Sequence, residues 1–471
     1  MPRNKDGVPL SIKPREAGTK LNWTIRHLRE AVADGRLQPG ERLPSHRDLA
    51  LQWQVSRGLV TTAYEQLQME GVLITRRGSG TFVAEHGDSS AQQLPSDEAL
   101  DFERSPIDMR LPFLAREADV SLFPISIWQR HVGAALKKDA DTLLLDKSLM
   151  GIPSLRVEIS TYLAFSRGIK CAPEDIMITT GARHAMDLIA RAMRRFTCEV
   201  WVENPGYAQA SFIFTKAGLT CVPVGVDEQG LMVDEGLRNS PGARLAFVTP
   251  AHQAPTGILM SQERRAQLLR WANQQDGYII EDDYDGCFTF TSARVPSLKS
   301  IDLDQRVFHM GSFNKLLFPA LRLGYLVIPP VLRRDLQEIK AASGWSTGAL
   351  EQLALTTFIQ EGCLSRHLRY AERVYAQRCR LTIESINAAF GERVEVTGTH
   401  GGFHFCLWFT EAVMATIHTL APALKVQPVQ REDSMGGLKT GIVIGFASLS
   451  DEVIRRSGAA LGLALRTAKT L

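Results

Sequence analysis

Cysteine pairs, long apolar runs and a leader segment are all missing from this chain. Its seven cysteines are scattered, odd in number and never spaced as C-x-x-C, so neither a disulfide framework nor a metal site is expected. No stretch approaches the roughly 18 apolar residues that cross a bilayer, and residues 1–20 lack the apolar core of a signal peptide. We therefore expect a cytoplasmic protein without membrane contact.

A strong excess of charge of one sign is also missing. The 471 residues carry a formal net charge of +3, with 22% charged and 44% hydrophobic residues, which is typical of a globular protein. Any surface for nucleic acid must therefore be a local concentration of arginine and lysine. The length predicts two or three domains.

Three zones of the chain differ in their patterns. Residues 12–84 are predicted to form helices followed by a short hairpin, and residues 85–113 are polar, contain proline and lack periodicity, which indicates a linker. From residue 114 to residue 471, short apolar runs alternate with helical patterns. This alternation predicts an α/β domain.

The first zone has the element order of a winged helix. One helical pattern ends at Gly35, Ser45 stands where the N-cap of a second helix belongs, and a third helix is predicted from about Ser56. Apolar runs on both sides of residues 76–80 (RRGSG) then predict a hairpin. We therefore expect an α+β winged helix-turn-helix domain.

Motifs in this zone resemble the GntR-type winged helix. They are GRLQPGERLPS at 35–45, RDLA at 47–50, VSR at 55–57, AY at 63–64 and RGSGT at 77–81. The resemblance implies binding of double-stranded DNA, with the start of the recognition helix at base edges. A lone arginine is usually solvated surface charge, but four in one module favour DNA contact. The implied DNA-binding residues are Arg47 and Arg57 at bases, Ser45, Arg76 and Arg77 at the backbone, and also Ser56 and Gly78.

Near-continuous apolar runs in the third zone predict buried strands of a parallel sheet. Polar residues collect just after these runs, where open α/β sheets bind their ligands. The runs end near residues 179, 203, 249, 282 and 311.

Several of these strand ends resemble the site of fold-type I enzymes that use pyridoxal 5′-phosphate (PLP), the aminotransferase fold. The motifs are GSFNK at 311–315, RLG at 322–324, EDDYD at 281–285, GAR at 181–183 and NPGY at 204–207. The resemblance implies that Lys315 forms the Schiff base (aldimine) and that Asp282 keeps the pyridine nitrogen protonated, so that the ring is an electron sink. It further implies Tyr284 at the ring's 3-oxygen, Tyr207 stacked on the ring, Ser312, Arg322, Ala182 and Arg183 at the phosphate, and Asn314 in the same site.

Residues 249–257 (TPAHQAPTG) depart from the aminotransferase pattern. Ala254 stands where aminotransferases carry an asparagine that bonds the 3-oxygen, and His252 or Gln253 could replace that bond. This form of the segment, joined to a GntR-type head, resembles the MocR/GabR-type subfamily of GntR regulators. Asp283 and Asp285, in contrast, are expected to be structural.

The substrate-binding side of the resemblance is weaker. Residues 440–447 (TGIVIGFA) lack the arginine that binds a substrate carboxylate in aminotransferases, and Arg431 could serve instead. Gln209 stands where GabR-like proteins carry an arginine. The resemblance implies a homodimeric regulator, and we expect it to sense an amine, an amino acid or PLP itself through the aldimine at Lys315. The alternative is a PLP-dependent aminotransferase with an appended DNA-binding domain.

Overall fold

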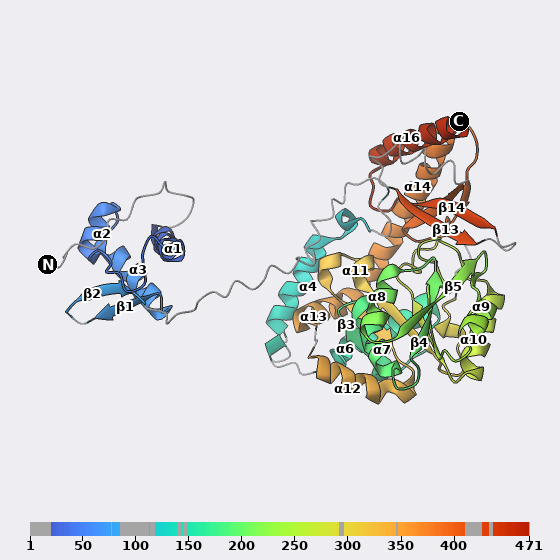
Figure 1. The fold of residues 1–471 in the computed structure, drawn as a ribbon, viewed down its shortest axis with the longest axis horizontal. Helices are drawn as coiled ribbons and strands as arrows, with labels where there is room; N and C mark the ends of the chain where they lie inside the picture. The colour runs from blue at the N-terminus through green and yellow to red at the C-terminus, as the bar shows by residue number, and fades with distance from the viewer. Residues whose placement is uncertain are drawn as a thin grey trace. The chain divides into compact units, whose positions relative to one another are not determined.

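The chain divides into two compact units, Met1–Ser105 and Pro106–Leu471, and each is described by itself (Figure 1). Of the residues singled out in the sequence, Arg77 and the segment 85–112 of the expected linker are outside the part of the chain that the structure describes. The computed structural model describes residues 20–76, 78–84, 113, 118–138, 143–144, 148–291, 296–344, 347–409, 426–432 and 437–470.

The first unit is a three-helix domain with a hairpin, as the sequence predicts. Ser45 caps the second helix by accepting from the Asp48 amide at 3.2 Å, and Ser56 caps the third by accepting from the Leu59 amide at 3.3 Å. The elements are α1 (Lys20–Ala33), α2 (His46–Gln52), α3 (Arg57–Met69), β1 (Leu73–Arg76) and β2 (Gly80–Val83).

The core of this unit lies between the three helices. Tyr64 of α3 is buried, and its hydroxyl donates to the Pro44 carbonyl at 2.9 Å. Trp23 and Trp53 meet edge to face with ring centroids 5.3 Å apart. This packing fixes α2 and α3 relative to each other, so that Ser45 and Ser56 each begin a helix on a rigid frame.

The second unit contains an eight-stranded sheet in the order β3-β10-β9-β8-β7-β4-β5-β6. The strands from β9 to β5 run parallel. The expected parallel strands are present, but β10 lies between β3 and β9 and is antiparallel to both. The bounds are β3 (Ile176–Thr179), β4 (Glu199–Asn204), β5 (Thr220–Asp227), β6 (Gly230–Leu231), β7 (Leu245–Val248), β8 (Tyr278–Asp282), β9 (Val307–Ser312) and β10 (Gly324–Val327).

Helices cover both faces of this sheet (Figure 1). Successive side chains of a strand point to opposite faces. In β4, Val200 and Val202 pack with one group of helices and Trp201 packs with the other. The first group is α7 (Ala182–Met193), α8 (Ala208–Lys216) and α12 (Arg333–Ser343); the second is α9 (Val233–Asn239) and α10 (Gln262–Gln274).

A C-terminal subdomain, residues 363–470, packs beside the sheet and shares its largest apolar cluster. Its four strands are antiparallel in the order β11-β12-β14-β13. The elements are α14 (Cys363–Phe390), β11 (Glu395–Thr397), β12 (His404–Phe409), β13 (Gln427–Glu432), β14 (Leu438–Gly445) and α16 (Asp451–Thr470). Ahead of them come α4 (Ile125–Lys138), α6 (Pro153–Arg167) and α13 (Ala349–Gln360).

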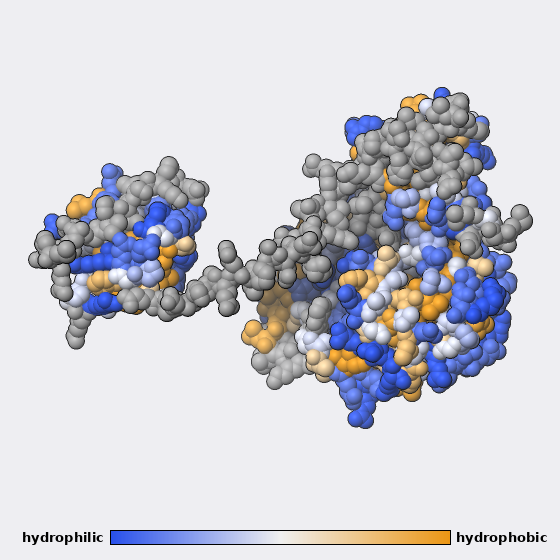
Figure 2. Space-filling view, viewed as in Figure 1, coloured by the Kyte–Doolittle hydropathy of each residue, from blue (hydrophilic) through white to orange (hydrophobic). Residues whose placement is uncertain are grey.

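Phe113 belongs to this second unit rather than to the expected linker. It is 1% exposed within the large apolar cluster, and its carbonyl accepts from the Gly445 amide at 3.1 Å. Elsewhere hydrophilic side chains cover much of the described surface in view, with apolar patches between them (Figure 2). In the part of the chain that the structure describes, no helix is both long and apolar enough to cross a membrane.

Candidate cofactor site and DNA-binding surface

The expected cofactor residues follow neighbouring parallel strands at their carboxyl ends. Tyr207 follows β4, Tyr284 follows β8, and Ser312 is the last residue of β9. Asp282, the last residue of β8, lies opposite Met310 of β9. Because carboxyl ends of parallel strands share one edge of a sheet, these side chains come from the same edge.

The residues expected at the phosphate converge through the antiparallel strand β10. Gly324 of β10 pairs with both Ser312 of β9 and Thr179 of β3. Gly181 has a φ of +132°, and a Cβ there would lie 2.8 Å from the Asn314 amide nitrogen and 3.8 Å from the Ser312 hydroxyl. Only glycine fits this position. The first turn of α7, with Ala182 and Arg183, begins at this glycine, and the first backbone N–H groups of a helix have no partner inside it.

Asn314 holds the backbone on both sides of this turn. Its amide nitrogen donates to the Thr180 carbonyl at 3.1 Å, and its carbonyl oxygen accepts from the Leu323 amide at 2.8 Å. Arg322, directly before Leu323, has a left-handed φ of 54°, a conformation that costs a non-glycine residue about 1 kcal/mol or more. Among the described residues, the exposed Arg322 guanidinium forms no ion pair. The bonds of Asn314 therefore hold the backbone at Leu323, directly after Arg322, and the next residue, Gly324, pairs with Ser312.

Lys315 lies on the short helix α11 (Phe313–Leu316), directly after β9, and is half-buried. Asp282 is 5% exposed at the end of β8. The next acidic residues have structural partners, as expected. Asp283 pairs with Arg167 at 2.6 Å, and Asp285 with His252 at 2.8 Å.

His252 and Gln253 are both buried, and both are bonded within the protein. The two ring nitrogens of His252 contact Asp285 at 2.8 Å and the Gly398 carbonyl at 3.2 Å. The Gln253 amide nitrogen donates to Glu203 at 3.1 Å and to the Pro205 carbonyl at 2.9 Å. The side-chain oxygen of Gln253 also accepts hydrogen bonds from the backbone amide and from the hydroxyl of Thr256. Both side chains therefore have partners within the protein, and His252 Nδ1 also lies 3.3 Å from the Tyr284 hydroxyl.

The two residues expected at the effector have different surroundings. Gln209 is half-buried in the first turn of α8. The Arg431 side chain is 1% exposed, pairs with Glu228 at 2.6 Å and lies over the Trp408 ring at 4.7 Å. Arg431 thus has an anionic partner already, whereas the Gln209 side chain is partly open to solvent.

Two buried carboxylates support the site and were not expected from the sequence. Glu203, the penultimate residue of β4, accepts from the Thr249 hydroxyl at 2.6 Å as well as from Gln253. Glu281 of β8 accepts from the His309 ring at 2.9 Å. Burial alone would raise the pKa of Glu281, but the charge and hydrogen bond of His309 outweigh it and lower this pKa to about 2. A charged residue inside an otherwise apolar strand is the signal that could have revealed both.

Replacing Glu203 by glutamine is expected to change how stability depends on pH. Burial raises the pKa of Glu203 from 4.5 to about 7, although the bonds from Thr249 and Gln253 lower it. A carboxyl whose pKa is raised in the folded state stabilises the fold most at pH values below its unfolded-state pKa. This stabilisation is lost as pH rises through the folded-state pKa of about 7. Between about pH 5 and about pH 8, the free energy of unfolding of the wild type should therefore fall by up to roughly 3 kcal/mol relative to that of Glu203→Gln. Urea denaturation at the two pH values measures this, and an equal difference at both would contradict it.

The expected DNA-binding residues lie at helix starts and on the hairpin. Arg47 and Arg57 are exposed in the first turns of α2 and α3, and neither forms an ion pair with the residues that the structure describes. Arg76 is exposed with its guanidinium 5.0 Å from the Phe82 ring centroid, and Gly78 has a φ of +76° in the turn. The exposed arginines expected at DNA therefore lie at the starts of α2 and α3 and on the β1–β2 hairpin, which is the wing.

Comparison with protein families matches both units. Residues 24–83 match the family "Bacterial regulatory proteins, gntR family", and residues 129–429 match "Aminotransferase class I and II". The kynurenine aminotransferase of Pyrococcus horikoshii has a similar fold, with a TM-score of 0.66 and 23% identity over 81% of this chain and 97% of that one. At this identity the likeness shows the fold alone.

Curated relatives match along nearly the whole chain. The probable rhizopine catabolism regulatory protein MocR of Rhizobium meliloti is 32% identical over 94% of this chain and 93% of its own length. The pyridoxine biosynthesis transcriptional regulator PdxR of Corynebacterium glutamicum is 31% identical over 95% and 96%. The uncharacterized regulator YdeL of Bacillus subtilis is 32% identical over 91% and 93%. The chain belongs to the MocR-type GntR family of transcriptional regulators, in which a winged helix precedes an aminotransferase-like domain.

Proposed function

We propose that the protein is a PLP-dependent DNA-binding transcription regulator that senses a small amine, an amino acid or PLP itself. The observation that carries the proposal is the convergence of Lys315, Asp282, Tyr284 and the Gly181 turn at one edge of the sheet, in a chain with a GntR-type head. Its domains would be residues 12–84, a linker up to about residue 112, and the remainder as the sensor. We place it in the cytoplasm, where its DNA target is.

The chemistry of these residues fits PLP. The cofactor supplies an aldehyde that condenses with primary amines and a pyridine ring that acts as an electron sink. Lys315 would hold the aldehyde, and Asp282 would face the pyridine nitrogen. Gly181 leaves space between Ser312 and Asn314 that a Cβ would fill. Ser312, Arg322 and the N–H groups of Ala182 and Arg183 would receive the phosphate. Tyr207 would stack on the ring.

We propose positioning roles for three residues that were expected at the cofactor. Since His252, Gln253 and Asn314 are bonded inside the protein, we propose that they position the site and do not touch the ring. Tyr284 would then bind the 3-oxygen alone. Gln209 is the better candidate for the effector, because Arg431 is paired with Glu228.

On the DNA side, we propose that Arg57 and Arg47 meet base edges from two helix starts. The caps Ser45 and Ser56 would orient these helix ends toward the backbone, and Arg76, Arg77 and Gly78 would form the wing contact. The partner would be a double-stranded operator.

We propose a homodimer that covers apolar side chains on α4 and α6. Figure 2 shows apolar surface in the region where α4 lies in Figure 1. Exposed apolar groups of this kind mark interaction surfaces. The side chains concerned are Ile125 and Leu136 of α4 and Val157 and Phe165 of α6.

Titration of the PLP-loaded protein with primary amines and amino acids tests the sensing role. We expect at least one of them to shift the visible absorption band of bound PLP, with keto acid released more slowly than about 1 s⁻¹, the low end of ordinary enzymes. Faster release would instead make the protein an aminotransferase, a role that its donor set and fold also suit. If no amine shifts the band and DNA affinity follows PLP alone, PLP is the signal.

A further inference from the structure

Residues 251–257 lie between the candidate cofactor site and the C-terminal subdomain. Five hydrogen bonds join this short segment to residues 397–406 of the subdomain. They are His252 Nε2 with Gly398 O at 3.2 Å, His400 Nε2 with Ala251 O at 3.0 Å, His404 Nε2 with Pro255 O at 3.0 Å, Cys406 Sγ with Pro255 O at 3.1 Å, and Thr397 Oγ1 with Thr256 O at 2.7 Å.

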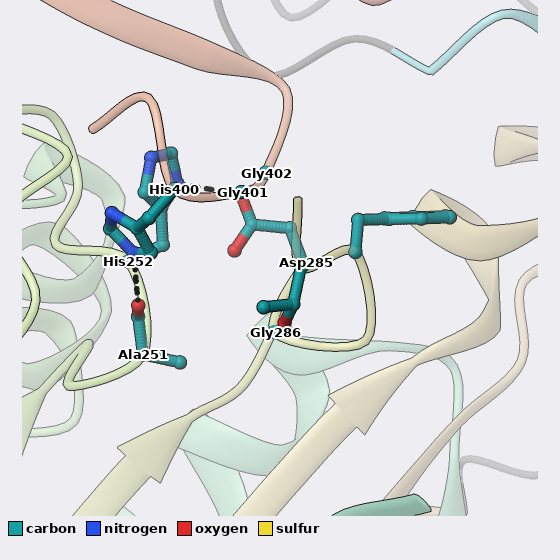
Figure 3. A pocket seen from close by; sticks show the side chains of 9 residues that line it. Ala251, His252, Asp285, Gly286, His400, Gly401 and Gly402 are labelled. Atoms are coloured by element: carbon teal, nitrogen blue, oxygen red, sulfur yellow. Dashed lines mark hydrogen bonds and ion pairs between the residues drawn. The ribbon is translucent and has the colours of Figure 1, made fainter. Parts of the chain in front are cut away.

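The backbones at this junction are in close contact. A Cβ on Gly257 would lie 2.6 Å from the Gly398 Cα, and a Cβ on Gly402 would lie 2.4 Å from both Asp285 and His252. The pocket left beside them has a volume of about 10 Å³, enough for about one water. Figure 3 shows it between the labelled His252, His400 and Asp285. A movement of one backbone must therefore move the other.

The same segment contacts the ring-binding residues on its other side. The Tyr284 hydroxyl donates to the His252 carbonyl at 3.0 Å and lies 3.3 Å from His252 Nδ1. Gln253 donates to the Pro205 carbonyl, two residues before Tyr207. The segment is therefore bonded directly to Tyr284 and to the backbone two residues before Tyr207.

His252 is the central residue of this junction. Its two ring nitrogens contact the Asp285 carboxylate at 2.8 Å and the Gly398 carbonyl at 3.2 Å. One buried side chain thus bonds Asp285 on the sheet side and Gly398 in the subdomain.

We propose that residues 251–257, with His252 as the positioning residue, couple the ligand state of Tyr284 to the C-terminal subdomain. The Tyr284 hydroxyl has one hydrogen, so it cannot donate to the His252 carbonyl and to a bound ring oxygen together. A ligand that takes this hydrogen removes one bond from the segment, and the change reaches residues 397–406 through His252 and Thr397. The inference rests on the proposed function, because it assumes that Tyr284 meets the cofactor.

Hydrogen–deuterium exchange of the full chain with and without added PLP tests the coupling. In the wild type, PLP should change the exchange rates of amides in residues 397–406 by at least about threefold, the scale of one net hydrogen bond. In His252→Asn, which keeps a donor toward Asp285 but not toward Gly398, the change should nearly vanish. His252→Gln, which keeps a donor near Nε2, should restore part of it.

A second variant and a control keep the test decisive. Thr397→Val removes the outer bond to Thr256, together with the bond that the Trp408 indole donates to the Thr397 hydroxyl at 2.9 Å, and should also reduce the change. His131→Phe alters another buried histidine, which bonds Thr357 and has no bond to the segment, and should leave the change intact. An unchanged wild type, or equal changes in wild type, His252→Asn and Thr397→Val, would overturn the coupling while the visible band still reports bound PLP. Absence of that band would overturn the proposed function as well.

Discussion

Replacing Lys315 by alanine is expected to abolish the visible absorption band of protein-bound PLP. The band requires a primary amine bonded to the cofactor aldehyde, and Lys315 follows the last residue of β9, at the sheet edge where Asp282 and Tyr284 also lie. Absorption spectra of purified variants measure this. Because α11 begins and ends within four residues, alanine there should not disturb the sheet.

Lys216→Ala is the matched control for this result. Lys216 is exposed at the end of α8, so its loss should leave the band intact. A band retained in Lys315→Ala would place the cofactor amine elsewhere, and the assignment of this edge of the sheet would be wrong.

Replacing Arg57 by alanine is expected to weaken binding to the operator by about fivefold to a hundredfold. A side chain that reads a base edge from the start of a recognition helix contributes about 1–3 kcal/mol. Arg57 is exposed in the first turn of α3, and its charge is not neutralised by any described ion pair. Fluorescence anisotropy with the upstream region of the gene at fixed salt measures the change.

Arg29→Ala is the control for the DNA measurement. Arg29 lies on α1 and is already paired with Glu70 at 2.7 Å, so its removal should change the affinity by less than about twofold. Equal losses in the two variants would mean that only net charge matters. Loss of the PLP band in Arg57→Ala would contradict the independence of the two units.

Local features of the fold were predictable because neighbouring residues decide them. Ser45 and Ser56 cap their helices through amides three residues away, and apolar runs in the sequence predict five strands of the large sheet, β3, β4, β7, β8 and β9. The antiparallel strand β10 was not predicted, because its four residues pair with β3 and β9 far along the chain. Tertiary pairing, not local pattern, decides its direction.

Contacts between residues far apart in the sequence also explain why the prediction of the site was incomplete. The partner of His252 in the C-terminal subdomain is Gly398, 146 residues away, and Arg431 meets Glu228 across 203 residues. No local pattern reveals such partners, so the bonds that these two residues make within the protein could not be predicted. Asp283 and Asp285 were expected to be structural, and their bonds to Arg167 and His252 agree.

The affinity of the full chain for its operator, with and without the ligand that occupies Lys315, tests the central claim most directly. Only differential affinity of the ligand for two states can change DNA binding. We expect PLP or a responsive amine to change the wild-type affinity by at least about fivefold, the low end of ordinary coupling, and to leave Lys315→Ala unchanged. Equal affinities of the wild type with and without ligand, or an equal response of Lys315→Ala, would contradict the account.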